Sequence, residues 1–213
     1  MLDTTKKKIG FVLNIVVLLL EVAAFVTSGK DWGVNALKYY TEDSNYLSLF
    51  ACLAMLIFTL RCMVKKEGEV PEAVYIVKYM SVCCLMVTFI VVMTVLWPMS
   101  GPDGYKRLLF WKCNLYKHLL CPVFAFISFV FFEADHKFKR KYVLYALMPT
   151  VAYAIVSITL NVLKLLHGPY PFLYVYEQPV YMSVVWTVVI ISGALLIAGI
   201  IYKIINWRNR VQD

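Results

Sequence analysis

The stretch Ala73 to Leu96, AVYIVKYMSVCCLMVTFIVVMTVL, decides the fold of this chain. It carries a single charged side chain, Lys78, in an otherwise apolar and aromatic run. A helix of about 20 apolar residues is long enough to cross the hydrocarbon core of a bilayer. The stretch therefore predicts a transmembrane helix rather than the core of a soluble domain.

Five further stretches of similar length lie on either side of it: Ile9 to Ser28, Asn45 to Val64, Asn114 to Phe132, Tyr142 to Leu166 and Tyr181 to Trp207. One of them includes the polar turn Asn114 to His118, and another carries Pro149, which a helix inside a bundle tolerates. The sequence thus predicts an all-α polytopic membrane protein, with six transmembrane helices in a single domain over residues 1–213.

The composition agrees with this prediction and excludes other classes. Of the 213 residues, 62% are apolar or aromatic and 16% are charged, against about 45–50% and 25% in soluble domains. Six spans leave only short connections, which excludes a sizeable aqueous domain. The net charge of +8 comes from short basic runs beside apolar segments, so we expect membrane lipids and no nucleic acid as partners. The six cysteines show no C-x-x-C or metal-ligand spacing, and we expect neither a metal nor another cofactor.

Lysine and arginine predict the orientation. They gather before the first span, after the second, before the fifth and after the sixth. The positive-inside rule then places both termini in the cytoplasm, and we expect the cell membrane as the location. Lys6 to Lys8 followed by an apolar run also resembles a cleaved signal peptide. That run is as long as a span, carries Glu21 and lacks an A-x-A cleavage site, which favours an uncleaved first helix.

Polar residues collect near the outer ends of the predicted spans, where they are costly and therefore informative. They are Glu21, Asn45, Ser48, Asn114, His118, Ser157, Asn161 and His167. This pattern predicts a polar pocket that opens outward and is covered by loops. Interhelical hydrogen bonding alone is the alternative explanation. In the inner half we expect little beyond Asn14, Ser81 and Lys78, with the Lys78 side chain reaching toward the inner interface.

One arrangement in this group carries possible chemistry. Thr41 comes just before the predicted second span, and His118 lies one turn into the fourth, with Asn114 four residues earlier on the same face. A hydroxyl, an imidazole that takes its proton and an amide that fixes the imidazole tautomer are the parts of nucleophilic acyl transfer. Backbone amides near Ser44 and Asn45 are candidates for stabilising an oxyanion. The alternative is that His118 is a polar anchor at a helix start.

Three motifs also carry a family resemblance. They are Lys38-Tyr39-Tyr40-Thr41 with Ser44 and Asn45, Asn114-x-x-x-His118 with Pro122, and Tyr170-Pro171-Phe172-Leu173. In this order and spacing they resemble the androgen-induced protein family, six-span membrane proteins that include the androgen-dependent regulator of tissue factor pathway inhibitor. The Thr-x-x-Ser-Asn form is similar to bacterial members.

The resemblance implies an intramembrane threonine hydrolase of lipid esters. In characterised mammalian members, a threonine and a histidine matching Thr41 and His118 hydrolyse fatty acid esters of hydroxy fatty acids. Thr41 is then the nucleophile and His118 the general base. We expect the supporting or substrate-binding residues to be Ser44, Asn45, Asn114, Glu21, Asn161, His167, Tyr170, Pro171 and Phe172. His167 could equally be a cap at the interface, and Glu21 could pair with a lysine or asparagine elsewhere.

A second class of function stays open, that of a non-enzymatic multi-pass protein that binds or transports a lipid or another small amphiphile. A transporter would place polar side chains along both halves of the bundle, and a binding protein would satisfy its polar cluster internally. The bias toward the outer half favours the hydrolase.

Overall fold

The computed structural model describes residues 4–65 and 68–212, and this part of the chain is helical without any strand. Six helices are long and apolar enough to cross a membrane, as the sequence predicted. The principal helices are α1 (Thr4–Trp32), α2 (Tyr40–Lys65), α3 (Glu72–Val91), α5 (Cys121–Ile127), α6 (Lys141–Val162) and α7 (Val180–Gln212).

Two of the spans contain π-helical turns beside a proline. The third span continues from α3 through η2 (Val92–Leu96) into α4 (Trp97–Met99), and so ends at Met99 rather than Leu96. The fourth span consists of η4 (Tyr116–Leu120), α5 and η5 (Ser128–Glu133). Pro98 and Pro122 lie two residues beyond the last residue of η2 and of η4, respectively. Proline lacks the N–H that would reach the fourth carbonyl before it and clashes with that carbonyl, so the wider π turn relieves both problems.

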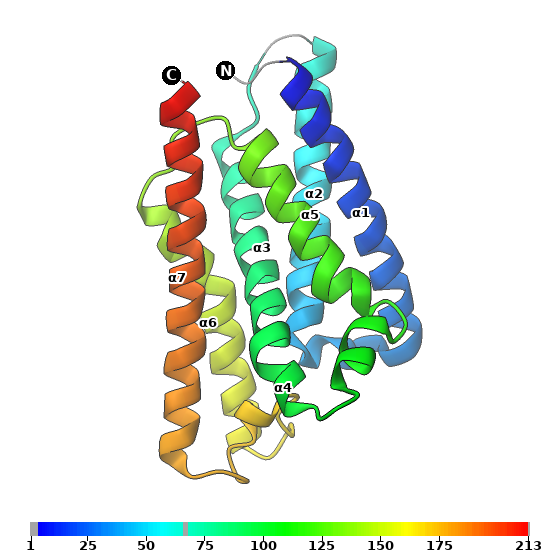
Figure 1. Cartoon of the computed structure of the whole chain (residues 1–213), viewed down its shortest axis with the longest axis vertical. Helices are drawn as coiled ribbons and strands as arrows, with labels where there is room; N and C mark the ends of the chain where they lie inside the picture. The colour runs from blue at the N-terminus through cyan, green and yellow to red at the C-terminus, as the bar shows by residue number, and fades with distance from the viewer. Residues whose placement is uncertain (1–3, 66–67, 213) are drawn as a thin grey trace.

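Helix α3 lies in the middle of the bundle, where it contacts α2, α5, α6 and α7, while α1 packs against α2 and α5 (Figure 1). The start of α1 and the end of α7 lie at the same end of the bundle, here called the terminal end (Figure 1). The opposite end, here called the loop end, carries the connections 33–39, 100–115 and 163–179 (Figure 1).

Several helix boundaries differ from the prediction, and two of these differences shape the loop end of the bundle. Helix α2 begins at Tyr40, not Asn45, so Thr41 lies inside the span and not before it. Glu42 and Asp43 occupy the first turn, where negative charge favours a helix. Helix α6 ends at Val162 instead of Leu166. Lys164 has a φ of +57° there, and the N–H groups after Val162 turn back onto carbonyls of the last turn, which is a Schellman ending.

The connection 163–179 folds back over the loop end of the bundle. The Asn161 side chain donates to the Leu173 carbonyl at 2.8 Å, next to the short 3-10 helix η6 (Pro171–Leu173). A Cβ atom on Gly168 would lie 2.6 Å from that same carbonyl oxygen, so only glycine permits this close approach. The fold of this connection places Tyr170 over the start of α2.

Candidate functional site

A polar pocket of about 400 Å³ opens at the loop end of the bundle. Thr41 and His118 both line it, although they lie on different spans. Other polar or loop residues around it are Glu42, Arg107, Asn114, Lys117, Tyr170 and Pro171. The fold therefore brings the two residues singled out in the sequence, Thr41 and His118, to one pocket.

A buried ion pair joins the two elements that carry these residues. The Nζ atom of Lys117 lies 2.5 Å from Oε1 of Glu42 and also donates to the Ser28 hydroxyl at 3.2 Å. Both charged side chains are at least 93% buried, since 7% and 6% of their surfaces are exposed. Glu42 follows Thr41 in the chain, and Lys117 precedes His118. The ion pair thus holds the start of α2 against η4. This ion pair was not predicted from the sequence. The available signal was that Glu42 and Lys117 are each next to a motif residue in the chain.

Ser44 and Asn45 position Thr41 and do not line the pocket. The Ser44 hydroxyl and the Asn45 amide donate to the Thr41 carbonyl at 2.9 and 2.7 Å, and the Thr88 hydroxyl bonds to Ser44 at 2.9 Å. Because α2 begins at Tyr40, the backbone amides of Ser44 and Asn45 lie in the hydrogen-bonded interior of the helix. The expectation that they stabilise an oxyanion is therefore wrong.

The His118 ring is oriented by a backbone carbonyl. Its Nδ1 atom lies 2.5 Å from the carbonyl oxygen of Leu108, in the π-helical turn η3 (Lys106–Phe110). A carbonyl only accepts, so Nδ1 carries the proton and Nε2 keeps its lone pair. Asn114 was expected to fix the tautomer, but its amide donates to the Arg107 carbonyl at 2.9 Å instead.

Tyr170 lies next to Thr41. Its hydroxyl accepts the Thr41 backbone N–H at 3.3 Å and is 3.5 Å from the Thr41 hydroxyl. Burial raises the pKa of Tyr170 to about 12, so the phenol keeps its proton at neutral pH and acts as a donor. The hydroxyls of Thr41 and Tyr170 are within hydrogen-bonding distance, whereas no direct hydrogen bond joins Thr41 to His118 in the described part of the chain.

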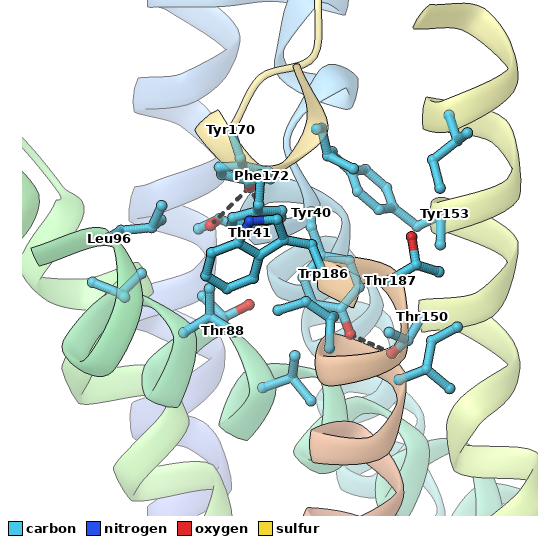
Figure 2. Close-up of a pocket in the computed structure, with 18 residues that line it drawn as sticks. Tyr40, Thr41, Thr88, Leu96, Thr150, Tyr153, Tyr170, Phe172, Trp186 and Thr187 are labelled. Carbon is cyan, nitrogen blue, oxygen red and sulfur yellow. Dashed lines mark hydrogen bonds between the residues drawn. The ribbon is translucent and has the colours of Figure 1, made fainter. Parts of the chain in front are cut away.

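A second, apolar pocket of about 60 Å³ begins at Thr41 and extends between α3, α6 and α7. In Figure 2, Thr41 lies beneath Tyr170 and Phe172, with Trp186 close by. Trp186 and Ile190 in its wall are half-buried, so the wall reaches the outer surface of the bundle. Thr41, Leu96 and Tyr170 line both pockets.

The remaining predicted residues lie outside the two pockets, except that Phe172 lines the apolar one. His167 forms an exposed pair with Glu177, with Nε2 2.8 Å from Oε1, five residues beyond the end of α6. Asn161 anchors the connection 163–179 from below. Glu21 is buried deeper between the helices, with 1% exposed. No group of three or more His, Cys, Asp or Glu residues within 4–65 and 68–212 is placed to hold a metal ion.

Comparisons with protein-family models, curated proteins and solved structures gave no match. The class of protein is therefore assigned from the fold and the two pockets alone. The chain is a multi-pass helical membrane protein with a polar and an apolar pocket that meet at a buried threonine.

Proposed function

We propose that this protein hydrolyses lipid esters, such as fatty acid esters of hydroxy fatty acids, with Thr41 as nucleophile and His118 as general base. One observation carries the proposal: Thr41 lies where the polar pocket meets the apolar one. When the ester of an amphiphile lies at this junction, its polar part fits the polar pocket and its acyl part enters the apolar pocket. The motif resemblance to the androgen-induced family supports the same assignment, and we propose membership of that family.

The chemistry follows from the two pockets. The first carbons of the acyl chain occupy the apolar pocket, the rest of the chain extends past Trp186 toward the bilayer, and the ester carbonyl lies over the Thr41 hydroxyl. His118 Nε2 takes the hydroxyl proton, directly or through one water, as the oxygen attacks the carbonyl carbon. The same proton passes to the departing alcohol, and water then cleaves the acyl-threonine. Catalytic hydrogen bonds are often long before substrate binds, which is compatible with the separate partners of Thr41 and His118.

We assign the oxyanion donor to Tyr170, because its protonated hydroxyl is adjacent to Thr41. Tyr170→Phe removes this donor and keeps the ring that covers the pocket. Loss of one such donor costs about 10²–10³-fold in kcat, so we expect a fall of about 10²-fold with little change in KM. Steady-state kinetics on a soluble short-chain ester measures both. An unchanged kcat in a folded variant would exclude Tyr170 from this role.

We propose that both termini lie in the cytoplasm of a cell-membrane protein, with the polar pocket facing outward, because the basic residues gather at the terminal end. Lys106 at the loop end and Lys139 at the terminal end are both well exposed, at 63% and 59%. In a Cys62→Ser background, Lys106→Cys should react with an impermeant maleimide on intact cells, whereas Lys139→Cys should not. The reverse pattern would contradict this orientation.

Labelling of the purified protein with a fluorophosphonate tests the proposed function. We expect a covalent adduct on Thr41, located by mass spectrometry of the digested protein. A folded protein that forms no adduct and cleaves no ester in a lipid panel would instead indicate that the pockets bind or transport an amphiphile without cleaving it.

A further inference from the structure

Among the described residues, five glutamate and lysine side chains line the interior between α1, α2, α3 and the fourth span, from one end of the bundle to the other. We call them the buried column: Glu42, Lys117, Glu21, Lys78 and Glu133. Glu42 and Lys117 line the polar pocket at the loop end. Glu133 is half-buried at the other end, with its Cγ atom near Gly10 of α1. This finding corrects the expectation that the inner half holds little polar chemistry.

Lys78 occupies the middle of the column and does not reach an interface, contrary to the sequence-based expectation. Its side chain is 0% exposed, and its Nζ atom donates to Asn14 Oδ1 and to Cys52 Sγ, each at 2.8 Å. Cys52 in turn is 3.9 Å from the Ser48 hydroxyl. Ammonium, thiol and hydroxyl groups thus form a continuous polar chain between α1, α2 and α3.

Glu21 lies beside this chain and is its least satisfied member. Ser48 and Cys121 lie next to it, and the charges of Lys78 on α3 and Glu42 on α2 act on it. Neither of its carboxyl oxygens is in hydrogen-bonding geometry with a described donor. By contrast, Glu42 is bonded to Lys117, and Glu133 accepts a hydrogen bond from Ser128.

The charges of the column do not balance. With every group ionised, three carboxylates face two ammonium groups, which leaves one uncompensated negative charge in a low-dielectric interior. Such a charge is expensive, and one bound proton removes it. The carboxyl group without a bonded partner, Glu21, is the one that gains most from that proton.

We propose that the buried column is a proton pathway across the bundle, in which Glu21 takes up and releases the proton. A proton that enters through the polar pocket binds a carboxyl oxygen of Glu21. On release, the Lys78 ammonium gives a proton to the unpartnered oxygen of Glu133 at the terminal end, and the proton of Glu21 replaces it on Lys78. Glu21 then remains as a carboxylate, which the restored Lys78 ammonium stabilises. This activity does not depend on ester hydrolysis.

Proteoliposomes with an internal pH dye test the pathway. With a potassium diffusion potential set by valinomycin, we expect wild-type vesicles to take up protons faster than protein-free vesicles. Glu21→Gln should lower the rate to the protein-free level. Glu72→Gln is the matched control, because Glu72 forms an ion pair with Lys139 on the surface, and its rate should equal wild type. Wild-type flux at the protein-free level, or full flux in a folded Glu21→Gln variant, overturns the proposal.

A measurement on the wild-type protein covers the case in which Glu21→Gln does not fold. Dicyclohexylcarbodiimide reacts with protonated carboxyl groups in apolar surroundings. We expect an adduct on Glu21, formed faster at lower pH and accompanied by loss of proton flux. Flux that persists after complete modification of Glu21, or a Glu21 that never reacts, also overturns the proposal.

Discussion

Replacing Thr41 with alanine is expected to lower lipid-ester hydrolysis by at least about 10³-fold and to abolish the fluorophosphonate adduct. Without the hydroxyl no acyl-enzyme can form, and what remains is the binding and the electrostatic environment of the pocket, as for other nucleophile deletions. The fold should tolerate the change, because the contacts that position Thr41 go to its backbone carbonyl and N–H. The release of fatty acid from a long-chain ester in detergent micelles measures the rate.

Two variants make this result specific. Thr41→Ser keeps a hydroxyl at the same position and should retain activity. Thr94→Ala removes a hydroxyl that faces outward and bonds only within its own helix, at 2.8 Å to the Ile90 carbonyl, so its rate should match wild type. Should Thr41→Ala cleave esters as fast as wild type, Thr41 is not the nucleophile.

Lys117→Ala is expected to destabilise the protein by about 3–5 kcal/mol, the cost of leaving one member of a buried ion pair without its partner. For a chain of this size this corresponds to a fall in Tm of about 6 to 20 °C. The remaining Glu42 carboxylate has no other bonded partner, since its second oxygen is already unsatisfied. Thermal unfolding of the detergent-solubilised protein measures the shift.

The double variant Glu42→Gln/Lys117→Met separates charge from packing. It removes both charges and keeps similar side-chain volumes, so it should regain most of the lost Tm. We still expect reduced hydrolysis in it, because the ion pair holds the start of α2 against η4 and so holds Thr41 and His118 at one pocket. A double variant as unstable as Lys117→Ala would show that packing, and not the charge, accounts for the effect.

The fold could be predicted from the sequence because hydropathy and length are local properties. The stretch Ala73 to Leu96 lies within the third span that the structure shows, from Glu72 to Met99. The start of α2 could not be predicted from hydropathy, since Glu42 and Asp43 look like loop residues until Lys117 neutralises one of them from another span. The end of α6 depends on the left-handed backbone conformation of Lys164, a conformation that glycine or asparagine usually supplies at a helix end and lysine rarely adopts.

The sequence predicted which residues line the site better than it predicted the contacts between them. Thr41, His118 and Tyr170 all line the polar pocket, whereas the partner of the His118 ring is a carbonyl, which every residue has and no sequence pattern reveals. The position of Lys78 could not be predicted either, because it depends on partners from other helices. A lysine in a span usually extends to the interface. The Lys78 ammonium instead stays inside the bundle, where it donates to Asn14 of α1 and Cys52 of α2.

For the proposed hydrolysis, the junction at Thr41 also determines where the two products go. The polar pocket opens at the loop end, while the walls of the apolar pocket reach the side of the bundle at Trp186. The two fragments of a cleaved amphiphile would therefore leave by different routes, the alcohol fragment through the polar pocket and the acyl fragment through the apolar pocket toward the bilayer. Departure of the two products by separate routes would oppose re-esterification, without any change in the equilibrium constant of the reaction.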